Sequence, residues 1–154
     1  MSTEQPLRVT LEQQEDFAFT LRFEDTGLED WLTDEPPPLG SGRGPNPSRL
    51  LLASVANCLV ASLLFALRKF KNEPGKLRAE ISAKLERNAA GRWRLPRASV
   101  VLTLGDDAAN LHQVERVLAQ FEEFCVVTQS VRDGIAVDVV VHDGTGAVIH
   151  QHTA

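Results

Sequence analysis

The chain has 154 residues, of which 43% are hydrophobic and 24% are charged, which is the composition of one globular domain and not of a disordered chain. The net charge of -5 leaves no basic footprint for a general nucleic-acid binder. Two cysteines in a chain of this length form neither a disulfide framework nor a zinc cluster. The amino-terminal residues lack the basic start and apolar run of a signal peptide, so we expect a cytoplasmic protein.

Alternating apolar residues predict an amino-terminal β-hairpin. Residues 7–11 and 17–23 alternate, and QQED (13–16) supplies the turn. Residues 33–48 then contain five of the eight prolines and three of the ten glycines. Such a segment predicts a loop, and its length favours a functional loop over a simple connector.

A long apolar helix is predicted after this loop. Pro47 has the place of a first helical residue, and Asn46 can serve as its N-cap. From Leu50 to Leu67 there are 18 residues without a charge, 15 of them apolar, which reaches the length of a membrane span. Three polar residues interrupt this run and a basic segment continues it, so we interpret it as a core helix and expect no membrane partner.

The rest of the chain predicts further strands and a second helix. Residues 77–86 alternate apolar and charged, as in a half-buried strand, and this accounts for the basic charges without a nucleic-acid partner. The expected elements that follow are a turn at 88–91, a strand at 99–104, a helix at 107–124 and a strand at 135–141, with a frayed HQHTA tail that offers no complete metal site. This order is an α+β pattern.

The two cysteines are the main candidates for chemistry. Cys58 lies about three turns inside the apolar helix, with Ser54 and Ser62 on the same face, and Cys125 is predicted to end the second helix. Two interpretations are open at this point. Both can be small buried hydrophobic residues, or they can be a reactive and a resolving thiol that form a disulfide during turnover.

The sequence around both cysteines resembles the OsmC/Ohr family, the osmotically inducible protein C and organic hydroperoxide resistance proteins. The similar strings are GPNPSRLLLASVANCLVASLL (44–64) and FCVVTQSVRDGIAVDVVV (124–141), and the resemblance extends over roughly residues 7–142. It implies one OsmC-like domain in residues 1–154. It also implies an α+β fold with antiparallel-rich sheets packed on two central helices, in an intertwined homodimer with active sites at the subunit interface.

The resemblance implies a cysteine-based peroxidase that reduces organic hydroperoxides and needs no metal or nucleotide cofactor. In such peroxidases the first cysteine, here Cys58, attacks the peroxide and becomes a sulfenic acid. The second, here Cys125, condenses with it to a disulfide. A dithiol, in some members a protein-bound lipoyl group, restores both thiols. The alternative is a non-catalytic protein of the same fold that binds a small molecule or senses redox state through its thiols.

The activation of Cys58 is where the sequence departs from the family. A free thiol with a pKa of about 8.5 is only a few per cent ionised at neutral pH, and Cys58 is too far inside its helix for the helix dipole to help. The family's peroxidases use an arginine in the first hairpin turn, held by a glutamate after the Asn-Pro. Here the turn reads QQED and Ser48 has the place of the glutamate.

Substitutes for this arginine and glutamate can be named from the sequence. The candidate thiolate-activating residues are Arg22, Arg43 and Arg49, and the candidate orienting residues are Glu35 and Ser48. Unless one of the arginines reaches Cys58, we expect its thiol to titrate at or above the free value and peroxide reduction to be slow.

Overall fold

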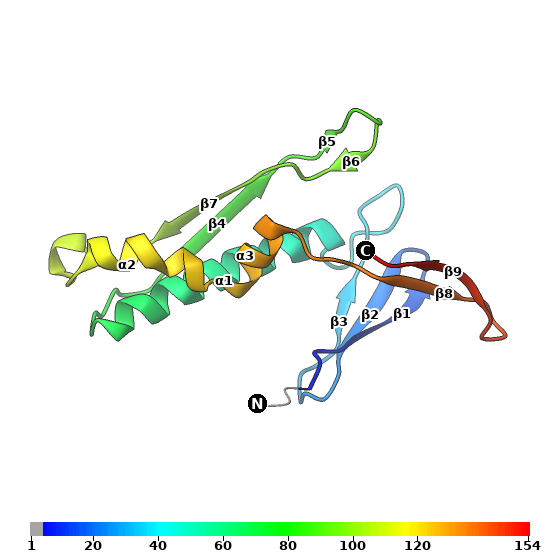
Figure 1. Cartoon of the computed structure of the whole chain (residues 1–154), viewed down its shortest axis with the longest axis horizontal. Helices are drawn as coiled ribbons and strands as arrows, with labels where there is room; N and C mark the ends of the chain where they lie inside the picture. The colour runs from blue at the N-terminus through cyan, green and yellow to red at the C-terminus, as the bar shows by residue number, and fades with distance from the viewer. Residues whose placement is uncertain (1–4) are drawn as a thin grey trace. The chain divides into compact units, whose positions relative to one another are not determined.

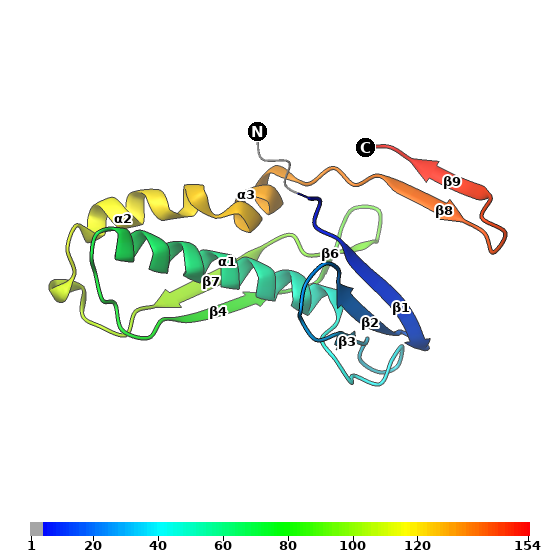
Figure 2. The same ribbon diagram turned by 90° about the horizontal axis from the view of Figure 1, so that it is seen from below.

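The computed structural model describes residues 5–154, shown from two directions in Figures 1 and 2. In chain order its elements are β1 (Val9–Glu15), β2 (Ala18–Phe23), β3 (Trp31–Thr33), α1 (Pro47–Lys69), β4 (Arg78–Ala83), β5 (Glu86–Arg87), β6 (Trp93–Arg94), β7 (Ala98–Thr103), η1 (Ala108–Asn110), α2 (Val114–Gln120), η2 (Phe121–Phe124), α3 (Val126–Asp133), β8 (Val139–His142) and β9 (Val148–His152). They form two compact units, one from the residues up to Ser54 with Ile81–Ser99, the other from Val55–Glu80 with Val100–Ala154.

The first unit contains the predicted hairpin, extended by one strand. β1, β2 and β3 form an antiparallel sheet in that order, drawn in blue and cyan in Figure 1. The predicted turn QQED is too long, because β1 continues through a bulge to Glu15 and the chain reverses at Asp16, which has a left-handed φ of 47°. β3 was not predicted because three residues are too short to show an alternating pattern.

Helix α1 begins where the sequence predicts. The side chain of Asn46 accepts a hydrogen bond from the N–H of Arg49 at 3.1 Å, so the predicted N-cap is confirmed. By length and composition alone α1 could cross a membrane, with a mean hydropathy of 2.4 over 18 residues, and a core helix of a soluble protein passes the same test. Its buried residues form one stripe at helical spacing, as expected of a core helix: Val55, Ala56, Leu59, Leu63 and Leu67.

The middle of the chain forms two short antiparallel pairings, β4 with β7 and β5 with β6. The predicted alternation in β4 is confirmed, since its charged residues are exposed and its apolar residues half-buried. The predicted strand 77–86 ends earlier, at Ala83, and β5 follows as a separate element. The predicted turn at 88–91 closes the β5–β6 hairpin.

The prediction of one helix over 107–124 is wrong. This segment contains η1, α2 and η2, and the chain breaks before α2 at Gln113, which has a left-handed φ of 53°. The buried side chain of Asn72 explains the break. It accepts from the N–H of His112 at 2.6 Å and donates to the carbonyl of His112 at 3.0 Å, so neither backbone group is free for a helix.

The carboxyl-terminal third also differs from the prediction. Cys125 ends the helical segment at η2 as predicted, but it also begins α3, which was not predicted. The last predicted strand, 135–141, is paired only from Val139. The tail is not frayed, because His150 and His152 belong to β9, which pairs antiparallel with β8. In the views of Figures 1 and 2, α2 and α3 lie alongside α1 in the second unit. Cys58, on α1, and Cys125, just before α3, belong to this one unit.

Candidate functional site

The second unit brings Cys58 and Cys125 together. Cys58 lies on α1 and is partly exposed, whereas Cys125 lies between η2 and α3 and is fully buried. Both are free thiols. Each thiol is among the groups that shift the pKa of the other, so the two sulfur atoms are close enough to interact. This is the arrangement that a reactive and a resolving thiol require.

Cys125 takes the place of a capping residue at the start of α3. Its backbone is extended (φ −80°, ψ 96°), and its carbonyl accepts the first helical hydrogen bond, from Gln129 at 3.0 Å. Thr128, three residues later, is buried, and its Oγ1 lies 3.1 Å from the Cys125 Sγ. Cys125 is therefore the N-cap residue of α3 by its backbone, but its side chain makes no capping hydrogen bond.

Of the two serines expected beside Cys58, only one contributes to the site. Ser62 interacts with both sulfur atoms, and the N–H of Val127, on α3, also reaches Cys58. The hydroxyl of Ser54 instead donates to the carbonyl of Leu50, four residues back on the same helix, at 2.8 Å. Ser54 lies one turn before Cys58, as the spacing indicates, but its hydroxyl bonds the helix backbone.

The two thiols have opposite pKa shifts. Burial raises the pKa of the Cys58 thiol, and the neighbouring Cys125 raises it further, against the weaker opposing effect of Val127 N–H and Ser62. Burial also acts to raise the pKa of Cys125, but its hydrogen bonds with Thr128, Cys58 and Ser62 outweigh burial and hold that pKa below its ordinary value. The raised pKa of Cys58 agrees with the sequence expectation. The lowered pKa of Cys125 was not expected.

Thr128 is the residue of this site that sequence reasoning missed. The signal that could have found it is its spacing, because a threonine three residues after Cys125 has the N-cap to N3 spacing of a capping pair. That spacing is informative only if a helix begins after Cys125. The valines at 126 and 127 favoured an extended segment there.

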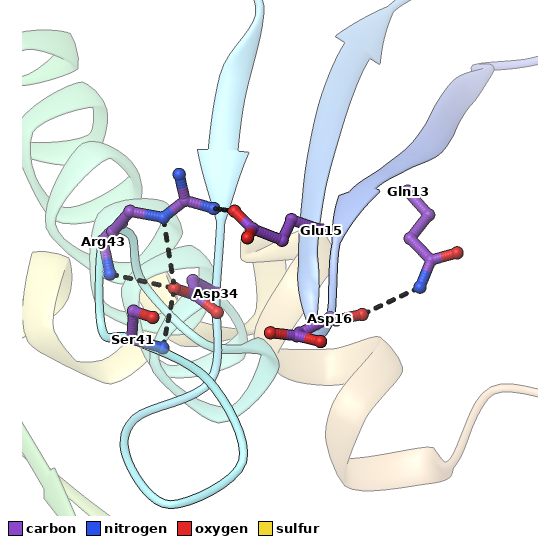
Figure 3. A network of polar contacts seen from close by, with 6 residues as sticks. All are labelled: Gln13, Glu15, Asp16, Asp34, Ser41 and Arg43. Carbon is purple, nitrogen blue, oxygen red and sulfur yellow. Dashed lines mark hydrogen bonds and ion pairs between the residues drawn. The ribbon is translucent and has the colours of Figure 1, made fainter.

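The candidate arginines Arg22 and Arg43 lie in the first unit, where carboxylates bind them. Arg22 pairs with Asp30 at 2.9 Å, and this hydrogen bond holds the pKa of the guanidinium above its ordinary value. Arg43 lies 3.7 Å from Asp34 and 3.8 Å from Glu15 (Figure 3). Arg49 follows the cap of α1 and gives its N–H to it. Each arginine thus has a local structural contact.

A buried carboxylate organises the loop before α1. The side chain of Asp34 is only 2% exposed and accepts hydrogen bonds from the N–H groups of Ser41 and Arg43, both at 3.1 Å (Figure 3). The hydrogen bond from the Arg43 backbone holds the pKa of Asp34 below its ordinary value, against the effect of burial. Residue 40 must be glycine here, because a Cβ would collide with Asp34 and with the Glu35 carbonyl.

The polar residues predicted to orient an arginine lie at the start of α1 and in the loop before it. Glu35 accepts a hydrogen bond from the side-chain amide of Asn46 at 3.2 Å and so contacts the N-cap of α1. Ser48 is the second residue of α1. The acid Glu15 ends β1, just before the hairpin turn, and the loop carries the base Arg43. The two charges are therefore exchanged relative to the arrangement that the family resemblance implies.

Comparison with known proteins identifies the family. The model of the OsmC-like protein family matches residues 40–140. No curated protein sequence matches the chain. Similar solved structures include an organic hydroperoxide resistance protein OsmC from Legionella pneumophila (17% identity, TM-score 0.66, 85% of this chain and 92% of that chain). They also include the organic hydroperoxide resistance protein OhrB of Bacillus subtilis (19% identity, TM-score 0.62, 83% of this chain and 91% of that chain). A third is an OsmC-like protein from Mycoplasma pneumoniae (14% identity, TM-score 0.67, 84% of this chain and 89% of that chain).

At these identities the solved structures show a shared fold of helices and antiparallel sheets, and nothing finer. The family match is independent of them and covers more than half of the chain, including both cysteines. The chain therefore belongs to the OsmC-like protein family.

Proposed function

We propose that the protein is a peroxidase that reduces organic hydroperoxides through a Cys58/Cys125 thiol–disulfide cycle. The observation that carries this proposal is the pair itself, a partly exposed thiol on α1 that interacts with a buried thiol at the start of α3. Two proteins of similar fold are named organic hydroperoxide resistance proteins, which supports the choice of substrate class.

In this cycle the exposed thiol reacts first. The sulfur of Cys58 attacks the distal oxygen of the hydroperoxide, the O–O bond breaks, and the alcohol leaves, so that Cys58 becomes a sulfenic acid. The sulfur of Cys125 then attacks Cys58, a water molecule leaves, and a disulfide forms. A dithiol reductant, of the lipoyl type or another, reduces the disulfide in two thiol–disulfide exchange steps. Both protein thiols are restored, and the dithiol becomes a disulfide.

A cavity partly lined by phenylalanines, in the same unit as the thiols, supports an organic rather than an inorganic peroxide. The cavity, of about 200 Å³, lies between the second half of α1 and the segment α2–η2. Four phenylalanines line it, among them Phe65, two helical turns beyond Cys58, and Phe124, immediately before Cys125, and the polar residues of the lining are Lys69, Arg116 and Gln120. Such a lining stabilises a hydrocarbon group by removing it from water.

We infer that the three candidate arginines hold the hairpin and the loop and do not ionise Cys58. The carboxylates bound to Arg22 and Arg43 support this view. Alanine at Arg22, Arg43 or Arg49 is then expected to leave the pH dependence of Cys58 alkylation unchanged in a Cys125→Ser background. A clear rise of the Cys58 pKa in one of these variants would identify that arginine as the activating cation.

We also propose that the protein acts as a cytoplasmic homodimer, intertwined around central helices, with the chain forming one OsmC-like domain. Large apolar side chains are exposed on α1 after Cys58 and on either side of Cys125 in the sequence: Phe65 is 73% exposed, Phe124 71% and Val126 74%. A two-fold partner is the commonest means of covering such a surface. Light scattering should give the mass of a dimer at micromolar concentration, and a folded monomer would contradict this.

The peroxidase proposal is tested with the purified, reduced protein. It should consume cumene hydroperoxide when a dithiol is present, and one equivalent of peroxide should remove two hydrogens from the intact mass as the disulfide forms. Cys125→Ser should stop at the sulfenic acid and then over-oxidise, and Cys58→Ser should leave Cys125 largely unreactive. A wild-type protein that keeps its reduced mass under peroxide would refute the cycle.

The raised pKa of Cys58 favours a second candidate function. A thiol that is mostly protonated reacts slowly with peroxide, which suits a redox sensor or a small-molecule-binding protein better than an efficient enzyme. The same experiment separates the two functions. A sensor forms the disulfide with one equivalent of peroxide but shows no sustained consumption when the dithiol is added.

A further inference from the structure

A strongly basic segment runs through the hairpin β5–β6, drawn in green in Figure 1. Residues 84–97 contain five lysines and arginines and one glutamate, a net charge of +4 in a chain whose net charge is -5. All six of these charged residues are exposed. The alternation of apolar and charged residues in β4 ends at Ala83, so it does not account for the charges of the hairpin.

These charges border a cavity of about 320 Å³. It lies where β4 leads into β5 and where β6 leads into β7, and all of its lining residues lie between Ser82 and Ser99. This stretch belongs to the first unit. The cavity is therefore built by one continuous segment of the chain, which contains neither cysteine.

Two cations of the lining are available to a ligand. Lys84 and Arg97 border the cavity, and within residues 5–154 neither belongs to an ion pair. The acid of the lining, Glu86, lies directly opposite Arg94 on the paired strand β6. Opposite charges at such a cross-strand position attract each other. The cavity therefore keeps a positive charge when Glu86 is compensated by Arg94.

The hydrogen-bond donors of the lining indicate which anion it fits. Besides Lys84 and Arg97, two hydroxyls line the cavity, that of Ser82 on β4 and that of Ser99 on β7. A phosphate ester offers three strong acceptor oxygens and nearly two negative charges, whereas a carboxylate offers two oxygens and one charge. Arginine binds phosphate through two parallel hydrogen bonds, and lysine binds it as a point charge. Two cations and two hydroxyls thus match a phosphate better than a carboxylate.

We propose that this cavity binds a small phosphate ester. Lys84 and Arg97 hold the phosphate, and Ala83 and Pro96, the apolar residues of the lining, contact the organic part. The volume supports an ester over the inorganic ion, because it reaches the size at which small-molecule sites begin, about 300 Å³. The site is separate from the thiol pair, so this inference does not depend on the proposed thiol–disulfide cycle.

Calorimetric titration of the whole reduced protein with phenyl phosphate tests the site. The wild type should bind this probe at millimolar concentration or below. Arg97→Gln and Lys84→Gln should each weaken binding by about tenfold or more, the effect of losing a hydrogen bond between charged groups. Glu86→Gln should not weaken it. Circular dichroism should show that each variant is folded, since all three side chains are exposed.

The matched control is Arg92→Gln, which removes an exposed cation of the same hairpin that does not line the cavity. It should leave the affinity nearly unchanged. An equal loss in Arg92→Gln and Arg97→Gln would mean general charge attraction and would overturn the site. A wild type that does not bind phenyl phosphate would overturn it as well.

Two further probes test the class of ligand. Benzoate, which carries a carboxylate on the same ring, should bind at least about tenfold more weakly than phenyl phosphate. Equal binding would overturn the choice of phosphate. Vesicles of phosphatidylcholine with phosphatidic acid should not compete with phenyl phosphate. Binding to these vesicles without binding to phenyl phosphate would assign the phosphate to a lipid headgroup and overturn the small ester.

Discussion

Within residues 5–154, each unit buries one side chain that can become an anion, Asp34 in the first and Cys125 in the second, and the two are stabilised in different ways. Asp34 accepts two backbone N–H groups and lies beside the guanidinium of Arg43. Cys125 has a hydroxyl, a second thiol and a helix start as its partners. A carboxylate with such partners is ionised at any neutral pH, so it acts as a permanent clamp. A thiol held only by neutral donors stays close enough to titration to exchange its proton during a reaction.

The sharpest way to test this difference is to remove the thiol and the carboxylate in turn. Cys125→Ala should abolish disulfide formation and reduce peroxide turnover to background, while the circular dichroism spectrum stays that of the wild type. Asp34→Ala should instead lower the stability of the fold, because the loop before α1 loses its central hydrogen-bond acceptor, while the thiol pair can still form its disulfide. Turnover retained in Cys125→Ala would show that the buried thiol has no part in the cycle.

The clamp at Asp34 should also be visible in the pH dependence of stability. The folded state lowers the pKa of Asp34. Its carboxylate therefore contributes to the free energy of unfolding above the unfolded pKa of about 3.9, and this contribution is lost as the pH falls through the folded pKa. Asp34→Asn should therefore be less stable than the wild type at pH 7, and the difference should narrow in acid. Denaturant unfolding at a series of pH values measures this.

A matched control for that variant is Asp25→Asn. Asp25 is 68% exposed and pairs with Arg8 at the surface, so its replacement should give a small effect with little dependence on pH. Equal pH profiles for the two variants would mean that Asp34 is no more than a surface charge.

The buried side chain of Asn72 tests whether a residue of the second unit can stabilise the fold without affecting the thiols. Its side chain makes two hydrogen bonds to the backbone of His112, so Asn72→Ala should lower the free energy of unfolding by about 1–3 kcal/mol. The Cys125 titration should not change. Asn110→Ala, which removes an exposed amide that donates to Asp106, is the control and should cost less. If Asn72→Ala lowers the free energy of unfolding no more than Asn110→Ala does, Asn72 does not hold the backbone of His112 in place.

The smallest expected effect is that of Glu15. Its carboxylate is 3.8 Å from Arg43 and 74% exposed, so Glu15→Gln should change the free energy of unfolding by no more than about 0.5 kcal/mol. The change should shrink further in high salt. A comparison with Glu12→Gln on the same strand separates the pair from general charge effects. A larger effect that persists in salt would show that Arg43 depends on Glu15 for its position.

The sequence predicted the elements whose signals are local. Pro47 and Asn46 marked the start of α1, and the prolines and glycines of 33–48 marked the loop, because capping and backbone restrictions depend on a few neighbouring residues. The break before α2 depends on Asn72, which is 40 residues away from His112 and so leaves no local trace. Helix α3 was missed because its valines favour strands, and tertiary packing outweighs that preference.

The sequence predicted the site only in part, again because a sequence pattern reveals local signals and not contacts between distant residues. The two cysteines were candidates as the two thiols of the chain, the family resemblance implied their roles, and the structure places them in one unit. Thr128 could not be recognised before α3 was known, since its spacing to Cys125 has meaning only at a helix start. The partners of Arg43 come from the hairpin turn and from the loop, two segments whose proximity no sequence pattern reveals.

The capping position of Cys125 has a consequence for the electrochemistry of the pair. If reduction of the disulfide yields one thiolate and one thiol, it takes up two electrons and a single proton between the pKa values of the two sulfur atoms. The midpoint potential should then fall by about 30 mV per pH unit in that range, and by about 59 mV per unit below it, where both sulfur atoms are protonated. Equilibration with a dithiol buffer at several pH values measures this slope. The pH at which the slope changes is the pKa of Cys125 in the reduced protein.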